Sequence, residues 1–520
     1  MSAPNATPER AAADSRRDAI LPALLALLAG ALVVVWRPPL PLDEIRYLEI
    51  LRESLRGGIW LLELGGEPYA DKPPLLFWLA RAAGLLGLPP EIALRLSPAL
   101  ASAGVVAIAG ALGRRLGLRL AGWTQAVLFL GFVYSQYVLF DPLLALGVWA
   151  AVLAWARGKD GAAAAAAALA GLAKGPVAFL HLAAFLWAFA PARPRREGAW
   201  RRGAAILGAG LLPLAGWALL AARAGGEEFA HELLWDRWAG RIGGSFAHRR
   251  PFLFYVPILL VGSLPFLPLL VAGRLPERRP APLRRLPGAL LALLVAFSAM
   301  GGKKPHYLLP LAPALALLAA ERIERTERGP RLARAGIAAL IVLGLLGLAA
   351  EPLYESWLHE RYGELAAGLL AGAAWRILHS AAILLSASAL VALLGGRPSL
   401  SRSLGAGLLA LAATFAPLHY AAGRLSFPFT LRRHLEGIPA AAPLVLLGER
   451  RAGFWEWLAR RSPLPRLSSP AEARPWAEEH PGGYLILDER IPSAELAPFL
   501  RCLAADRLRG NPVGLFVAEG

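Results

Sequence analysis

The stretch from Leu42 to Trp78 reads LDEIRYLEILRESLRGGIWLLELGGEPYADKPPLLFW and holds two dense polar clusters. The first cluster opens with Asp43 and Glu44, and the second is the Asp71-Lys72 pair with the two prolines that follow it. The apolar segment 20–36 comes directly before, and it is long enough to cross a hydrocarbon layer about 30 Å thick. Charged residues are therefore concentrated where the chain has just left the lipid.

The composition of the whole chain agrees with a membrane protein. Of 520 residues, 56% are hydrophobic and only 18% are charged, and the mean hydropathy is +0.48, which is too apolar for one soluble core. We predict an all-α polytopic membrane domain over residues 20–421 with about thirteen spans. They lie near 20–36, 92–112, 121–140, 142–156, 161–173, 175–191, 203–221, 252–272, 286–300, 305–320, 333–350, 374–394 and 403–421.

Two apolar segments have special interpretations. We expect 20–36 to be a retained anchor, because no small-residue cleavage site of a signal peptide follows it. The run 75–88 is short and flanked by prolines, so we expect a re-entrant or interfacial segment.

The basic residues indicate the orientation in the membrane. With the N-terminal tail 1–19 in the cytoplasm, 25 of the 55 basic residues fall in short cytoplasmic connections, as the positive-inside rule expects. This distribution explains the net charge of +18 better than nucleic-acid binding does. The same orientation places the outer loop 37–91, with interfacial helices, and the C-terminal region outside the cytoplasm.

The C-terminal region 422–520 is less apolar and is predicted to be a small soluble α/β domain. Short buried strands are expected at 444–447, 484–487 and 513–517, with helices at 452–460, 471–479 and 494–503 between them. Parallel strands are plausible because helices separate them. The domain has no glycine-rich phosphate loop, and the single cysteine, Cys502, cannot form an internal disulfide.

Residues 43–56 have apolar positions at helical spacing and are expected to form an amphipathic helix on the membrane surface. Asp43 and Glu44 are either catalytic acids or acids favoured at a helix N-terminus. Asp71-Lys72-Pro73-Pro74 is either a stiff arm that presents a lysine to a phosphate or an ordinary charged turn.

Several further charges stand at the boundaries of apolar runs or inside them. Asp141 is isolated between two apolar runs, which predicts a function or a buried cationic partner. Arg95 and Lys174 either contribute to a site or extend to the interface. Two outer loops contribute a second set of candidates, namely His248, Arg249, Lys304, His306 and Tyr307. The loop basic residues with Lys72 would suit a phosphate or pyrophosphate, whereas no tight ligand spacing supports a metal site.

Six motifs in consistent order resemble one family. Over about residues 20–320 they are similar to the aminoarabinose transferase and protein mannosyltransferase-like family, polyprenyl-phosphate-sugar-dependent glycosyltransferases of the GT-C fold. The motifs are Asp43-Glu44-x-Arg46-Tyr47, Asp71-Lys72-Pro73-Pro74, Arg95-Leu96-x-Pro98, Asp141-Pro142, Lys174-Gly175-Pro176 and Lys304-Pro305-His306-Tyr307-Leu308-Leu309-Pro310.

The resemblance implies roles for these residues. Asp43 would be the principal catalytic acid/base, Asp141 a second acid, and Arg46, Lys72 and Tyr307 would hold the lipid phosphate. Asp71 and His248 fall where relatives are proposed to hold a divalent ion, although many relatives carry Glu at the position of Asp71. The residues Glu44, Tyr47, Arg95, Lys174, Arg249, Lys304 and His306 complete the candidate set.

The implied reaction is transfer of a sugar, with inversion, from a polyprenyl phosphate to a lipid (such as lipid A), a glycan or a protein. It would take place at the outer face of a bacterial inner membrane and needs no nucleotide cofactor. Displacement of a lipid phosphate requires cations near the departing phosphate and a carboxylate near the nucleophile, and the motifs supply both. The alternative is a lipid or solute transporter, for which charges at the bilayer midplane would be expected.

Overall fold

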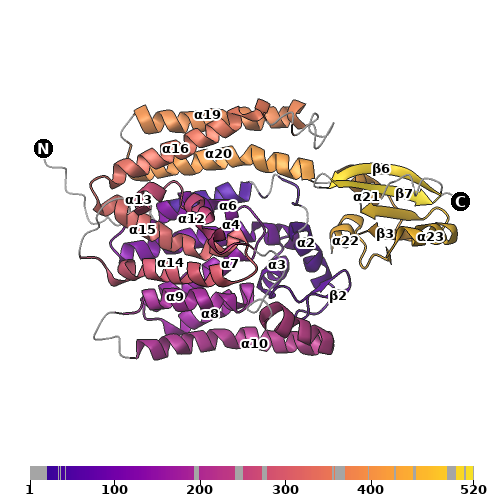
Figure 1. Cartoon of the computed structure of the whole chain (residues 1–520), viewed down its shortest axis with the longest axis horizontal. Coiled ribbons are helices and arrows are strands. Elements are labelled where there is room, and N and C mark those ends of the chain that lie inside the picture. Colours follow the sequence, from indigo (N-terminus) through magenta and orange to yellow (C-terminus); the bar gives the residue numbers. More distant parts are fainter. Residues whose placement is uncertain are drawn as a thin grey trace. The chain divides into compact units, whose positions relative to one another are not determined.

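The structure of the chain is a computed structural model. Long apolar helices make up most of it (Figure 1). It describes residues 20–32, 34, 37–40, 43–191, 198–239, 250–271, 278–353, 357, 369–395, 398–426, 429–448, 453–488, 499–508 and 511–518. The chain divides into two units. The helical unit comprises Met1–Val35, Ala70–Ala349 and His379–Ala416, and the sheet unit comprises Trp36–Tyr69, Ala350–Leu378 and Pro417–Gly520.

Six helices of the described chain are long and apolar enough to cross a membrane by length and composition. They are α4 (Pro90–Arg115), α10 (Ala199–His231), α14 (Ala281–Ala299), α16 (Gly329–Ala349), α19 (Ala373–Gly395) and α20 (Leu400–Ser426). Large apolar side chains on them are exposed, for example Leu212 at 70% and Leu384 at 67%, as expected of surfaces that face lipid. The prediction of a polytopic membrane protein is confirmed, while the number of thirteen spans stays a prediction.

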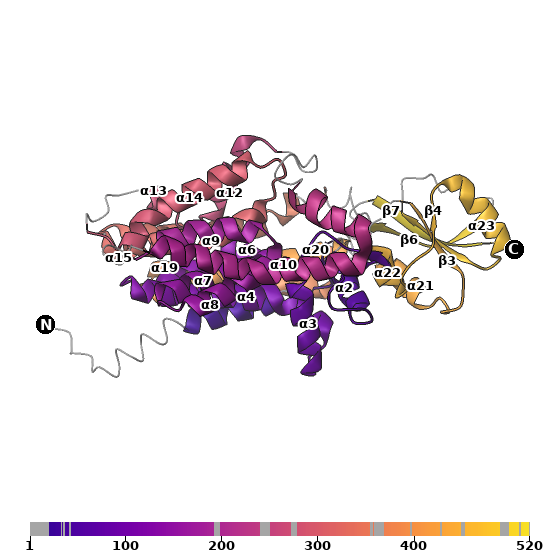
Figure 2. The same cartoon turned by 90° about the horizontal axis from the view of Figure 1, so that it is seen from below.

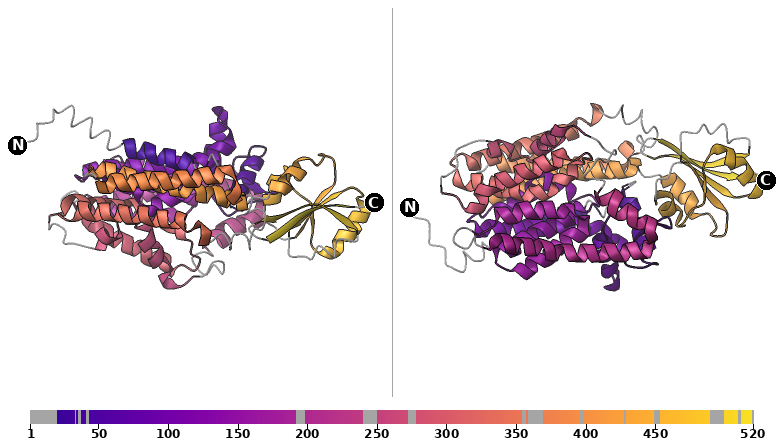
Figure 3. Two further views of the ribbon diagram at one scale, coloured as in Figure 1. Left: turned by 90° about the horizontal axis from the view of Figure 1, so that it is seen from above. Right: turned by 60° about the horizontal axis from the view of Figure 1, so that its bottom comes forward.

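Shorter helices accompany these six. They are α3 (Leu75–Leu85), α5 (Ala121–Val127), α6 (Phe129–Tyr134), α7 (Asp141–Ala156), α8 (Asp160–Lys174), α9 (Val177–Ala188), α12 (Tyr255–Gly262), α13 (Leu267–Val271) and α15 (Ala312–Arg325). Three helical stretches of other types, η1 (Glu232–Ala239), η2 (Phe252–Phe254) and η3 (Pro305–Leu311), accompany them. In the helical unit, α8, α9 and α10 pack side by side (Figures 1 and 3).

Two predicted spans are not continuous helices. The segment 121–140 breaks between α5 and α6, where Leu128 is extended at φ −61 and ψ 119. The N–H of Phe129 there donates to the carbonyl of Leu264 at 2.9 Å rather than within a helix. The segment 252–272 is likewise divided into η2, α12 and α13. Neither predicted span is therefore one continuous helix, and at the first break a contact with distant backbone replaces a local helix bond.

The sheet unit contains a five-stranded sheet of order β4-β3-β5-β7-β6. Its strands are β3 (Leu444–Gly448), β4 (Arg466–Leu467), β5 (Tyr484–Asp488), β6 (Leu500–Leu508) and β7 (Asn511–Ala518). The α/β character is confirmed, with β3 parallel to β4 and β5, but β7 runs antiparallel to both β5 and β6. The predicted helix 494–503 is wrong from Leu500 onward, because this segment is the edge strand β6; residues 494–498 lie outside the described chain.

Both faces of this sheet are covered. On one face Leu444 and Leu446 of β3 pack with the helices α21 (Phe429–Glu436) and α22 (Phe454–Ala459). On the other face Val445 and Leu447 pack against α23 (Ala473–Glu479). Figure 2 shows the sheet from its end, with α21 and α22 on one side and α23 on the other. Because alternate residues of β3 point to opposite faces, a continuous apolar run is what a strand covered on both sides requires.

The outer loop also contributes to the sheet unit. Its helix α2 (Asp43–Ser54) and the hairpin β1 (Glu63–Leu64) and β2 (Glu67–Pro68) belong to the same compact unit as the C-terminal strands. The sequence prediction assigned residues 37–91 and 422–520 to separate domains. The structure divides the chain differently, because α2 buries one face against the C-terminal region.

Candidate functional site

The turn between α7 and α8 brings two charged helix ends together. Only residues 157–159 join these helices, which therefore run antiparallel, so that the N-terminus of α7 and the C-terminus of α8 lie at the same end. Asp141 opens α7 and Lys174 closes α8, where the helix dipoles favour an acid and a base respectively. The chain continues after Lys174 through Gly175, whose φ of 77° suits a residue without a side chain.

Asp141 and Lys174 form a buried ion pair. Lys174 Nζ donates a hydrogen bond to Asp141 Oδ1, and the Asp141 side chain is only 2% exposed. The second carboxylate oxygen, Oδ2, lies 3.8 Å from His306 Nε2. The isolated acid that the sequence singled out thus has the cationic partner that its burial demands.

The segment η3 brings two predicted site residues to this pair. Lys174 Nζ lies 4.3 Å from the centre of the Tyr307 ring, a cation–π contact. His306 and Tyr307 also touch each other edge to face, with ring centres 5.1 Å apart. The N–H of the Trp149 indole on α7 donates to the Pro310 carbonyl at 2.8 Å and fixes η3 against α7.

Lysines add further positive charge near this pair. The charge of Lys72 acts on both Asp141 and His306, and Lys304 acts on His306. Lys72 Nζ also donates to the Asp71 carbonyl at 3.3 Å. Lys303 differs, because it is buried and donates to the carbonyls of Met300 and Arg250 at 2.6 and 3.0 Å. Lys72 and Lys304 thus add positive charge close to Asp141 and His306. Lys303 instead stabilises its own loop through hydrogen bonds to backbone carbonyls.

The predicted metal ligand Asp71 is engaged by a cation. Its Oδ1 lies 3.0 Å from Arg237 Nη1, and Arg237 also bridges to Glu232. The described residues hold no group of three or more potential His, Cys, Asp or Glu ligands. The other predicted ligand, His248, lies outside the described residues, as does Arg249. The described part of the chain therefore offers no ligand set for an ion at Asp71, and the divalent ion stays a prediction.

The first polar cluster lies on α2, in the sheet unit. Asp43 is half-exposed and pairs with Arg46, one helical turn later, at 3.3 Å. The Arg46 Nε is buried and finds no hydrogen-bond acceptor among the described residues. Glu44 points elsewhere, since its Oε2 accepts hydrogen bonds from Arg37 Nη1 at 2.6 Å and from the Leu40 N–H at 3.0 Å. Of the two acids, Asp43 is the one exposed to solvent. Glu44 instead binds Arg37 and Leu40 in the segment that precedes the helix.

Two further predicted residues, Tyr47 and Arg95, lie in helices α2 and α4. Tyr47 is buried in α2 at 4% exposure. Arg95 is half-buried in the second turn of α4. Their roles stay predictions.

Two residues at these sites were not predicted. Tyr134 at the end of α6 packs edge-on against His306, with ring centres 6.0 Å apart, and Arg237 holds Asp71. Tyr134 carries no sequence signal, because an aromatic residue in an apolar run is unremarkable in composition. Arg237 stands among several basic residues of one segment of the sequence, and only the structure shows its contact with Asp71.

Parts of the chain are similar in sequence to known membrane glycosyltransferases. The family model described as dolichyl-phosphate-mannose-protein mannosyltransferase matches residues 42–193. An undecaprenyl phosphate-alpha-4-amino-4-deoxy-L-arabinose arabinosyl transferase of Sodalis glossinidius is 33% identical over 311 residues, covering 55% of this chain and 54% of that protein. The protein of the same description from Yersinia enterocolitica is 31% identical over 321 residues, covering 57% of each chain.

The solved structure of ArnT from Cupriavidus metallidurans bound to undecaprenyl phosphate superposes with a TM-score of 0.73 over 96% of this chain and 97% of that one, at 21% identity. The chain is thus similar to the aminoarabinose transferase and protein mannosyltransferase-like family in part of its sequence and in its fold. The superposition confirms the GT-C fold that the resemblance implies. The matched part spans about half the length of the curated family members.

Proposed function

We propose that this chain is an integral membrane glycosyltransferase that moves a sugar from a polyprenyl phosphate to an acceptor. One observation carries the proposal: a buried carboxylate, Asp141, is paired with Lys174 beside His306 and Tyr307, within the field of Lys72. Such a concentration of lysine charge around a fixed acid suits a lipid phosphate at a membrane surface. Relatives named for undecaprenyl phosphate-linked aminoarabinose support this donor class.

The proposed reaction is a single displacement with inversion. An acceptor oxygen or nitrogen attacks the anomeric carbon and loses its proton to a carboxylate, for which Asp43 is the candidate. The bond from the anomeric carbon to the phosphate oxygen breaks, and the polyprenyl phosphate leaves with the electron pair. Lysines near the departing phosphate stabilise the charge that develops on it.

The contacts of each residue suggest its role in the proposed reaction. Asp141 is already bonded to Lys174, so we assign it the role of holding Lys174 in place rather than of taking a proton. Lys72 and Lys174, with Tyr307 beneath Lys174, are assigned to the donor phosphate. Arg46 on α2 is assigned to an anion because its buried Nε finds no acceptor among the described residues. A divalent ion, where one is bound, would supply further charge neutralisation, and no step here depends on it.

We further propose a bacterial inner-membrane location, with the N-terminus in the cytoplasm and the sheet unit outside. The basic connections between spans support this orientation. A donor carried by a membrane lipid also agrees with the absence of a nucleotide fingerprint in the sequence.

The test is a comparison of the cell envelope with and without this chain. Mass spectrometry of lipid A, glycans and envelope proteins should reveal one class that loses a pentose or hexose when the gene is deleted and regains it with the wild-type gene. The Lys72→Ala variant should restore little of it, whereas Lys303→Ala, if it folds, should restore more. Unchanged envelope molecules, together with altered movement of a lipid across the membrane, would instead establish a transporter.

A further inference from the structure

The helix that carries Asp43 and Arg46 is part of the hydrophobic core of the C-terminal sheet. Ile45 is fully buried in one cluster with Leu446, Phe454 and Trp455. This side chain lies two residues after Asp43 and directly before Arg46. The sheet unit therefore includes the N-terminal end of α2 in its own packing and does not stand apart as an independent module.

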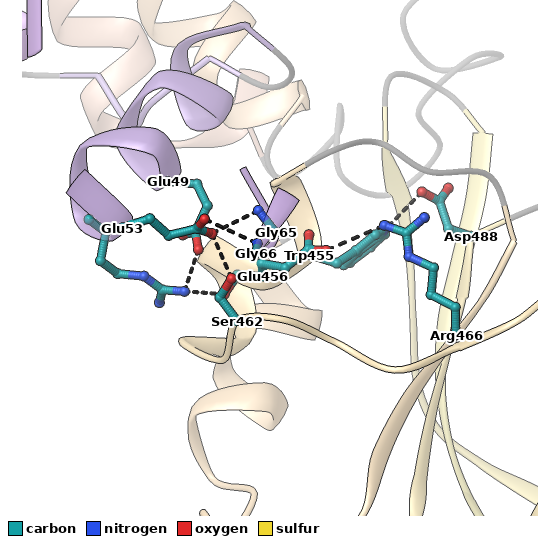
Figure 4. A network of polar contacts seen from close by, with 10 residues as sticks. Glu49, Glu53, Gly65, Gly66, Trp455, Glu456, Ser462, Arg466 and Asp488 are labelled. Carbon is teal, nitrogen blue, oxygen red and sulfur yellow. Dashed lines mark hydrogen bonds and ion pairs between the residues drawn. The ribbon is translucent and has the colours of Figure 1, made fainter. Parts of the chain in front are cut away.

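A carboxylate at the other end of α2 ties three segments together. Glu53 Oε1 accepts hydrogen bonds from the Gly65 N–H at 2.8 Å and from Ser462 Oγ at 2.6 Å. Its Oε2 accepts from the Gly66 N–H at 3.2 Å. Figure 4 shows these donors converging on Glu53 from the hairpin and from the C-terminal region. We call Glu53, Gly65, Gly66 and Ser462 the Glu53 clamp.

The hairpin turn is built to make this contact. Gly65 and Gly66 have φ values of 67° and 79°, which correspond to the two-residue turn with positive φ at both positions. This turn aims two consecutive N–H groups at Glu53. Hydrogen bonds to an ionised carboxylate are stronger than neutral ones, and Glu53 is only 7% exposed, so little water competes for it.

A second set of contacts joins α2 to α22. Arg52 Nη2 lies 2.5 Å from Glu49 Oε1 and donates to the Glu456 carbonyl at 3.2 Å. Gly453, just before α22, allows the close approach, since a Cβ there would lie 2.3 Å from Leu64 Cδ1 and 3.2 Å from Glu49 Cβ. Both α2 and the hairpin are therefore held against the C-terminal region along their length.

We propose that Glu53 is a positioning residue for sugar transfer: through the Glu53 clamp, the C-terminal domain fixes the helix that presents Asp43 and Arg46. This inference rests on the proposed function. Asp43 and Glu53 are ten residues apart on one helix, about 15 Å along its axis, so a loss of the clamp changes the tilt of α2 and displaces Asp43. The C-terminal domain then serves catalysis by orientation, without contacting the reacting atoms.

The first experiment measures how firmly α2 and the hairpin are held and needs no activity. Hydrogen exchange of the full-length protein in detergent is compared between wild type, Glu53→Gln and Glu478→Gln. The Gln side chain keeps the shape of Glu53 but loses its charge and one acceptor. Glu478 is a matched control, because it lies on α23 in an exposed pair with Arg474. We expect faster exchange over residues 43–68 in Glu53→Gln alone, with β3 and β5 still protected; unchanged exchange over 43–68 would overturn the proposal.

The second experiment measures turnover of the same proteins at a temperature where all remain folded. We expect kcat to fall about 10- to 100-fold in Glu53→Gln, to fall less in Ser462→Ala, and to recover in Ser462→Thr, which restores the hydroxyl. The loss in a Glu53→Gln/Ser462→Ala double variant should be smaller than the product of the single losses, because both act through one contact. A lower melting temperature with kcat within about twofold of wild type would reduce Glu53 to a purely structural residue.

The two experiments separate the inference from the function on which it rests. Should the wild-type protein transfer no sugar from any donor offered, the proposed function is wrong, and the exchange data still decide whether Glu53 orients α2. Should the wild type be active while Glu53→Gln retains its kcat, the proposed function stands and the positioning role is wrong.

Discussion

Asp43 and Glu44 are neighbours with different surroundings, and their substitutions should therefore differ in effect. Asp43 is half-exposed beside Arg46, whereas Glu44 is buried in an ion pair with Arg37. Asp43→Asn should lower transfer by at least about 10³-fold, as the loss of a catalytic base does, with no change in melting temperature. Glu44→Gln should instead lower the melting temperature, because Arg37 is left buried without its charge partner. Near-wild-type turnover in Asp43→Asn would remove this residue from the mechanism.

The Asp141–Lys174 pair gives a second prediction. Lys174→Met leaves a carboxylate that is 2% exposed without the lysine that hydrogen-bonds it, and we expect a loss of about 3–5 kcal/mol in unfolding free energy. Lys174→Arg keeps the charge and should lose less. Urea unfolding in detergent provides the measurement. The control is Lys159→Met, an exposed lysine at the opposite end of α8, and equal stability of Lys174→Met and this control would contradict the account.

The residues most readily predicted from the sequence were charges in apolar surroundings. Asp141 and Lys174 drew notice because an isolated charge in an apolar run costs free energy, and the structure pairs them with each other. Tyr134 and Arg237 were missed because their importance comes from distant partners, His306 and Asp71 respectively. No local pattern encodes such contacts.

At the scale of elements, α2 contains a group that makes the sheet unit sensitive to pH. Burial raises the pKa of Glu49 to about 8, an effect that Arg52 partly opposes and that neighbouring Glu53 reinforces. The ordinary value is 4.5, so between these pH values the folded unit holds one proton more than the unfolded chain. Its stability should therefore fall as the pH rises from about 4.5 to about 8 and level off above that.

Glu49→Gln tests this dependence. The amide cannot ionise, so the variant should lose the decline in stability between about pH 4.5 and about pH 8 and should be the more stable protein at the upper end. Limited proteolysis of the sheet unit across this range measures the change. Parallel pH profiles for Glu49→Gln and wild type would show that Glu49 is ionised throughout, held by Arg52.

Helices and strands were predicted well where local pattern decides them. The spans at α4, α14, α16 and α19 agree with the apolar runs to within a few residues, as do the buried strands β3 and β5. The strand β6 was not predicted, because its residues Leu500, Arg501 and Ala504 favour a helix and only pairing with β7 makes it a strand. The break at Leu128 has the same kind of cause, a backbone contact with Leu264.

At the scale of the whole molecule, the predicted orientation in the membrane can be tested with reporter fusions. Alkaline phosphatase fused after Gly520 should be active in a bacterial host, because the sheet unit is predicted to lie outside the cytoplasm. The same enzyme inserted at Gly158, in the connection between α7 and α8, should be inactive. An inactive fusion at Gly520 would overturn the predicted number of spans.

The association of residues 36–69 with the C-terminal sheet was the least predictable feature of the molecule. Composition marked 422–520 as a separate soluble domain, and amphipathic spacing marked 43–56 as a surface helix, yet Ile45 and Glu53 join the two. Contacts between residues some four hundred positions apart leave no trace in a single sequence. What the sequence did indicate correctly is the helical membrane character of most of the chain and the α/β character of its C-terminal region.

Sugar transfer by the purified protein tests the central claim most directly. The protein in lipid nanodiscs is offered undecaprenyl phosphate-linked aminoarabinose or another polyprenyl-phosphate sugar, with lipid A, a glycan or a protein as acceptor. The account predicts that wild-type protein releases polyprenyl phosphate and forms one glycosylated product of inverted anomeric configuration, and that Asp43→Asn forms none. Consumption of no donor by wild type in the presence of every acceptor, or equal product from Asp43→Asn, would contradict it.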